Sequence, residues 1–159
     1  MLRRSIFCAL VFVLTIGAEP VNTPKSQCEE LLDTVLPFAE KMLSTHGEFF
    51  PFGASMKSDG TIALAAAYEG NERPPSQPLI DMLHKAFHAD AMKGAIRASA
   101  LVYDVLVIPP GTNTKTDAIA VELDHRDKYS TVVYFPYSID EGKVTLQAPF
   151  ANQGTFGIF

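Results

Sequence analysis

The sequence predicts a single α+β domain, residues 28–159, in which helices pack on an antiparallel sheet of about five strands in the order α-β-β-α-β-β-β. Two segments, 26–46 and 76–97, repeat their apolar residues with the period of an amphipathic helix. Shorter apolar runs bounded by Gly, Pro, Asn and Asp lie between and after them, as strands and turns do. The chain has 159 residues, 47% of them hydrophobic, which is enough for one core.

Residues 1–18 have the layout of a secretory signal peptide. The basic start MLRR precedes the apolar run SIFCALVFVLTIG, and small residues suited to cleavage stand at Gly17 and Ala18. The apolar run is shorter than the roughly 20 residues of a membrane span, although an uncleaved anchor is the alternative. We therefore expect a periplasmic or secreted protein with no membrane insertion after cleavage. The mature chain would keep only Cys28 and so would have no internal disulfide.

The first helix is expected to follow a short flexible leader, residues 19–27, which is polar and contains prolines. Ser26 and Glu29 form the S-x-x-E pattern of a capping box that opens the helix. Pro37 is expected to kink the helix or to split it in two, and Gly47 is a natural stop. Its apolar stripe consists of Leu32, Val35, Leu36, Ala39, Met42 and Leu43.

The remaining elements follow from turn signals between apolar runs. EFFPFGASMK and TIALAAAYEG are joined by an Asp-Gly turn, which indicates a hairpin. Ser76 is expected to cap the second helix, which we expect to run to about Arg97. SALVYDVLVIPP is apolar on both faces and is expected to be a central strand. TDAIAVELDH and YSTVVYFPY are expected to form another strand pair, and KVTLQAPF is the candidate for a further strand. The tail ANQGTFGIF is too aromatic to be left in water.

Composition and motifs exclude several classes of function. The formal charge of −5 gives no broad basic surface for nucleic acid. The triplet His125-Arg126-Asp127 occurs in protein kinases, but the chain lacks a glycine-rich phosphate loop and is too short, so we expect a turn between two strands. No G-x-S-x-G nucleophile motif is present.

The segment HKAFH places His84 and His88 four residues apart on the second helix, a spacing that can chelate one metal ion. A zinc protease has Glu directly after the first histidine as general base, and Lys85 occupies that position here. We therefore favour a solvated face that carries histidines. The sequence predicts neither a metal nor another cofactor, with His84 and His88 kept as weak candidate ligands.

Asp104 interrupts the otherwise apolar run ALVYDVLVI. If the strands around 100–108 and 117–125 pair in the register that aligns their apolar residues, Asp104 lies beside Glu122. Two carboxylates side by side repel each other unless they share a proton or a cation, and such a pair could serve acid–base work. Asp104 and Glu122 are therefore weak catalytic candidates. The alternatives are a solvated face or neutralisation by a nearby basic residue.

The order of elements is similar to that of profilin-like and roadblock-like domains, in topology only. The pattern GEFFPFG…SDG with KTDAIAVELDHRD resembles small uncharacterised bacterial secreted proteins, which implies export but no activity. Without a catalytic motif, the sequence favours a non-enzymatic binding or interaction module, with an unknown protein partner or its own copy as the partner. The alternative is a small hydrolase-like or metal-dependent enzyme that uses Asp104 and Glu122 or His84 and His88.

Overall fold

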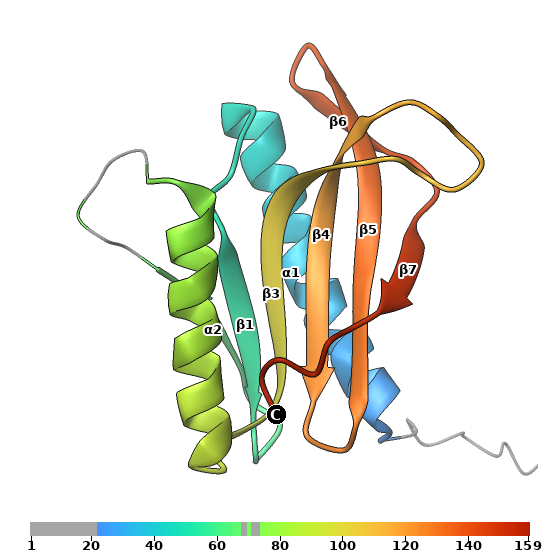
Figure 1. Ribbon diagram of the computed structural model, residues 1–159. Coiled ribbons are helices and arrows are strands. Elements are labelled where there is room, and N and C mark those ends of the chain that lie inside the picture. Colours follow the sequence, from blue (N-terminus) through green and yellow to red (C-terminus); the bar gives the residue numbers. More distant parts are fainter. Residues whose placement is uncertain (1–21, 68–69, 71–73) are drawn as a thin grey trace, which may run out of the picture.

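The computed structural model describes residues 22–67, 70 and 74–159, in which two helices pack on a seven-stranded antiparallel sheet (Figure 1). The elements are α1 (Pro24–His46), β1 (Phe52–Lys57), β2 (Ile62–Ala66), α2 (Ser76–Met92), β3 (Ile96–Val107), β4 (Thr116–His125), β5 (Tyr129–Asp140), β6 (Lys143–Leu146) and β7 (Phe150–Gln153). The strand order is β2-β1-β3-β4-β5-β6, and β7 also pairs with β5. None of the helices in these ranges combines the length and the apolar character needed to cross a membrane.

The predicted α+β class is confirmed, with two strands more than expected. KVTLQAPF and the tail supply both β6 and β7, which pair with different parts of β5. Each is only four residues long, too short to show a clear alternation in sequence. The predicted signal peptide, residues 1–18, lies outside the described residues.

The first helix begins earlier than its sequence pattern indicated. Thr23 is the N-cap. Its side chain accepts a hydrogen bond from the N–H of Ser26, and the Ser26 side chain accepts one from the N–H of Thr23, so Ser26 is the third helical residue of a capping box rather than the cap. The prediction of a flexible leader up to residue 27 was therefore wrong from Pro24 onward, because Pro is favourable in the first turn. The helix continues through Pro37 without splitting and ends at Gly47, as predicted, in a left-handed conformation.

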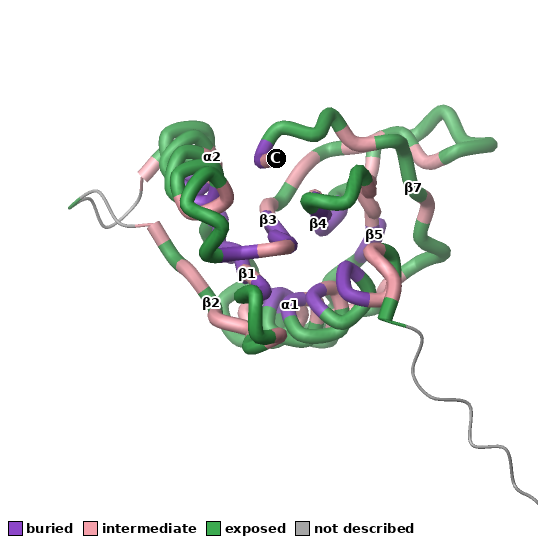
Figure 2. Tube along the Cα trace, turned by 90° about the horizontal axis from the view of Figure 1, so that it is seen from below, coloured by how far each residue is buried: buried purple, intermediate pink, exposed green. Residues whose placement is uncertain are grey.

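The two faces of the sheet are covered differently (Figure 2). The helix α1 crosses one face and builds the larger core with residues such as Val102 and Val121, both fully buried. The helix α2 and the chain after β7 cover part of the other face. A second apolar cluster there joins Leu83, Phe87, Ile96, Leu101 and Ile158. The tail thus packs through Ile158, whereas its aromatic residue Phe156 is 41% exposed, so the expectation that the tail is withdrawn from water holds only in part.

The register of β3 and β4 differs from the predicted one. Asp104 pairs with Ile119, and Glu122 pairs with Leu101. Neighbouring residues of a strand point to opposite faces, so Asp104 lies on the α1 side with Val102, and Glu122 lies on the α2 side. The predicted Asp104–Glu122 pair does not form. Both faces of these strands are apolar, so hydrophobic alignment could not choose between registers that exchange the faces.

Candidate ligand-binding site

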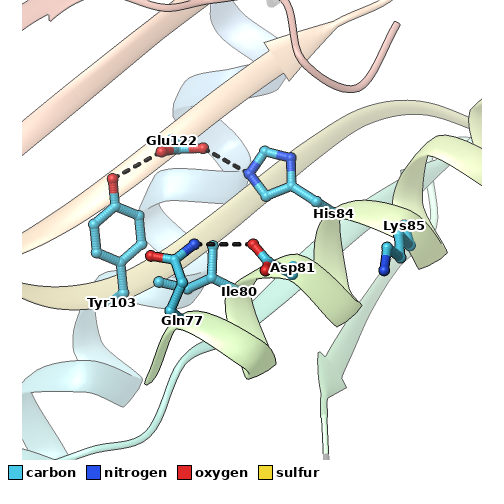
Figure 3. Close-up of a pocket in the computed structure, with 7 residues that line it drawn as sticks. All are labelled: Gln77, Ile80, Asp81, His84, Lys85, Tyr103 and Glu122. Atoms are coloured by element: carbon cyan, nitrogen blue, oxygen red, sulfur yellow. Dashed lines mark hydrogen bonds and ion pairs between the residues drawn. The ribbon is translucent and has the colours of Figure 1, made fainter. Parts of the chain in front are cut away.

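A pocket of about 500 Å³ lies between α2 and the sheet (Figure 3). The helix contributes residues related by i, i+3 and i+4 spacings, which share one side of it, and the sheet contributes Tyr103 from β3 and Glu122 from β4. The stripe Leu79, Leu83 and Phe87 is buried, so α2 is anchored beside the pocket rather than over it. The complete lining is Gln77, Ile80, Asp81, His84, Lys85, Tyr103 and Glu122.

The carboxylate of Glu122 is the centre of the polar contacts. Its Oε1 accepts a hydrogen bond from the Tyr103 hydroxyl at 2.7 Å, and its Oε2 lies 3.1 Å from Nε2 of His84. An ionised carboxylate only accepts, so Nε2 of His84 carries the proton that it donates. The side chains of His84 and Glu122 are 31% and 29% exposed, so the pair is shielded but open to the pocket.

The phenol of Tyr103 is held in its protonated form. Burial raises the pKa of Tyr103, and the hydrogen bond to Glu122 and the negative charge of that carboxylate raise the pKa further. Tyr103 therefore remains a donor to Glu122 across the physiological range. This donor and the imidazole fix the carboxylate from two sides before any ligand arrives.

The rest of the lining is mixed in character. Gln77 donates from Nε2 to Oδ1 of Asp81 at 2.9 Å, within one turn of α2. Ile80 adds an apolar wall, and Lys85 lies apart from the other side chains, with its amine directed away from Glu122 (Figure 3). The pocket thus offers acceptors near an aromatic ring and an aliphatic side chain.

The two histidines of HKAFH have different partners. His84 contacts Glu122, and Nδ1 of His88 lies 2.8 Å from the carbonyl oxygen of Ile158, to which it donates. They do not converge on a common point, and no group of three or more His, Cys, Asp or Glu side chains in the described ranges could hold a metal ion. The expectation that these histidines lie on a solvated face holds only in part, because both rings link α2 to other parts of the fold.

The chain after β7 is fixed next to the pocket by Asp124 and Ser130. Asp124 accepts a hydrogen bond from the Ser130 hydroxyl and another from the backbone N–H of Ile158 at 3.1 Å. The N–H of Phe156 donates to Ser130 at 3.2 Å. Gly157 passes beside His84, since a Cβ on this glycine would lie 3.4 Å from Cε1 of the ring. The tail therefore borders the pocket on the His84 side.

Asp104 lies outside the pocket. It is exposed at the far end of β3, where its Oδ1 accepts a hydrogen bond from Tyr137 at 3.0 Å. Partial burial raises the pKa of Asp104, against the lowering effect of Tyr137, and the charge of Asp117 raises it further. The neighbouring acid is thus Asp117 and not Glu122, with which the sequence had paired Asp104.

The remaining candidates of the sequence are structural. Arg126 and Asp127 lie in the turn between β4 and β5, as predicted, and His125 is the last residue of β4. His125 is buried; its Nδ1 accepts from the backbone N–H of Asp127, so its Nε2 donates to Oε1 of Gln27 at 2.8 Å and ties α1 to the sheet. Burial lowers the pKa of His125. Burial also raises the pKa of the Cys28 thiol to about 12, so Cys28 is an inert core residue.

Sequence reasoning did not identify Tyr103 or Gln77 as site residues. Tyr103 reads as one more large residue of an apolar strand, and only the register shows that it shares a face with Glu122. Comparisons with protein-family models, with curated proteins and with solved structures find no match for this chain.

Proposed function

We propose that this protein is an exported, non-enzymatic binding domain that holds a small polar ligand in the pocket between α2 and the sheet. The observation that carries the proposal is the carboxylate of Glu122, fixed between Tyr103 and His84 and exposed to a cavity of about 500 Å³. Export is inferred from the segment MLRR-SIFCALVFVLTIG and completes the proposal.

The size and lining of the pocket support a small molecule as the ligand. Ligand cavities usually measure roughly 300–1,000 Å³ and combine apolar walls with a few placed polar groups. Here Ile80 and the ring of Tyr103 provide the walls, and Glu122 and Asp81 provide acceptors. Because Glu122 is oriented in advance, binding does not have to order this side chain, which favours affinity.

A second candidate, an acid–base enzyme, is favoured by one observation. Glu122 orients the imidazole of His84, as carboxylates orient catalytic histidines. The sequence had named both residues as candidates, but in two separate pairs. Among the described residues that line the pocket there is no Ser, Thr or Cys to act as a nucleophile. Binding remains the leading proposal because the oriented carboxylate, the apolar wall and the size of the pocket all support it, whereas the enzyme rests on the contact between His84 and Glu122 alone.

Native mass spectrometry of the protein purified from its own host tests the proposal. We expect a mass that corresponds to cleavage near Ala18, with a small molecule bound. The fraction of protein that carries this ligand should decrease in Tyr103→Phe, which removes only the hydroxyl that orients Glu122. It should stay unchanged in the control His46→Ala, because His46 is an exposed residue at the end of α1.

If no ligand co-purifies, a library of small polar fragments can be titrated while backbone amide NMR signals are followed. We expect shifts confined to α2, Tyr103 and Glu122. Fragments that perturb only other regions, or that bind Tyr103→Phe and the wild type equally well, contradict a ligand site here. Turnover of a bound fragment by the wild type and not by His84→Ala would instead favour the enzyme.

A further inference from the structure

The strand β2 is an open edge of the sheet. It stands at the end of the strand order and pairs with β1 alone, from Ile62 opposite Met56 to Ala66 opposite Phe52. In the ranges that the structure describes, no other strand pairs with it. The backbone N–H and C=O groups that point away from β1 are therefore available to another strand.

This edge lacks the features that usually prevent strand addition. From Thr61 to Ala67 the sequence TIALAAA has no charge and no proline, and its register with β1 has no bulge. The strands at the opposite end of the sheet differ. There β6 carries Lys143, and β7 exposes Asn152 and Gln153. Among the strand ends that the structure describes, the β2 side combines an unpaired backbone with an uncharged sequence.

Both faces of the β2 edge are apolar and partly exposed. On the α1 side, Leu64 is 56% exposed, and the ring of Phe38, 40% exposed, packs against Phe52 with its centroid 4.9 Å away. On the other side a cavity of about 440 Å³ lies between β2 and α2, where Met82 is 39% exposed. Residues added beyond β2 would cover apolar surface on both faces.

We propose that β2 pairs antiparallel with β2 of a second copy, about a two-fold axis at Leu64. This register is the one in which all five residues of the strand find partners: Ile62 opposite Ala66, Ala63 opposite Ala65, and Leu64 opposite its own copy. The uncharged strand places no like charges across the axis, so it is complementary to itself. The single β2 edge of each chain is consumed, so the assembly closes as a dimer and does not grow into a fibre.

The dimer is independent of the proposed ligand site. Met82 and Ala86 line the cavity next to β2, whereas Gln77 and His84 line the candidate pocket on the other side of α2. Pairing through β2 leaves that pocket open. Each proposal can therefore fail without the other.

Sedimentation analysis of the full chain tests the pairing. We expect a dimer for the wild type and a dissociation constant at least roughly tenfold higher for Leu64→Lys, because two ammonium groups would face each other across the axis. The matched control is Leu106→Lys on β3, since Leu106 is 55% exposed and lies away from this edge. It should dimerise as the wild type does.

A disulfide trap tests the register itself. In a chain that also carries Cys8→Ser, Leu64→Cys should form a cross-linked dimer under mild oxidation, since cross-strand neighbours at an axis are within disulfide reach. Leu106→Cys should not, and the buried Cys28 should not interfere. A wild type that stays monomeric up to roughly 100 µM, far above the micromolar range of weak dimers, overturns the proposal. Equal dissociation constants for the Leu64→Lys and Leu106→Lys dimers would also overturn it, as would failure of Leu64→Cys to cross-link.

Discussion

Replacing Gly53 by Ala tests how closely α2 must approach the sheet. Gly53 lies in β1 directly under Phe87 of α2, with an extended backbone that any residue could adopt. A Cβ there would lie 2.8 Å from two atoms of the Phe87 ring and 2.5 Å from the carbonyl oxygen of Ala100. The oxygen belongs to the neighbouring strand β3, so it cannot move without disturbing the ladder between β1 and β3.

We expect Gly53→Ala to lower the free energy of unfolding by about 1–3 kcal/mol, the usual cost of overpacking a filled core. For a domain of this size that loss corresponds to a decrease in Tm of roughly 3–10 °C. Urea denaturation followed by far-UV circular dichroism measures it, since the chain has no Trp. The control is Gly157→Ala, whose Cβ would meet its nearest atom at 3.4 Å, an ordinary contact, and which should change stability little.

The same substitution should weaken the pocket. An outward shift of α2 moves His84 away from Glu122, so ligands of the pocket should bind less tightly to Gly53→Ala than to the wild type. Combining Gly53→Ala with Phe87→Leu should recover part of the lost stability, because the smaller side chain removes one of the two close contacts. If Gly53→Ala is as stable as the wild type, the close approach of α2 does not determine the geometry of this face.

Two further predictions concern pH. Because the folded state favours neutral His125, the free energy of unfolding should decrease as pH falls below the ordinary pKa of 6.5. Urea titrations at pH 7.5 and 5.5 measure this decrease, which should be smaller for His125→Gln than for the wild type. The raised pKa of Asp104 makes its ionisation unfavourable to the fold, so wild-type stability should decrease as pH rises from the ordinary value of 3.8 through the raised one. Asp104→Asn should lack that decrease and be at least as stable at pH 7; clear destabilisation there would show that ionised Asp104 stabilises the fold through Tyr137.

The fold class could be predicted because its signals are local. The Asp-Gly turn before β2 and the left-handed Gly47 each mark an element boundary within a few residues. The start of α1 was misplaced because two capping patterns overlap: Ser26 suits both an N-cap and the third helical position, and only the structure shows Thr23 in the capping role. Errors of this kind move an element by one turn and leave the architecture unchanged.

The candidate site could not be predicted because it depends on long-range register. Glu122 and His84 are 38 positions apart, and the weak candidates of the sequence paired each of them with the wrong residue. The spacing of His84 and His88 indicates a shared face of a helix, but not that one ring turns to β4 and the other to the tail. Likewise, β3 and β4 are apolar on both faces, so no pattern within them could show that Asp104 and Glu122 point to opposite sides.

The groups that form the pocket also hold α2 in place, which decides how variants of the site must be interpreted. His84 links α2 to β4, His88 links it to the tail, and Phe87 between them rests on Gly53. Truncating Glu122 would remove the acceptor of two hydrogen bonds, each worth about 1 kcal/mol to stability, so a loss of binding in that variant would confound the ligand with the fold. Tyr103→Phe keeps the ring and leaves the bond from His84 in place. Its cost to stability is therefore limited to the one lost bond, about 1 kcal/mol. A loss of ligand by Tyr103→Phe under conditions in which this variant remains fully folded separates recognition by the pocket from the stability of the face that builds it.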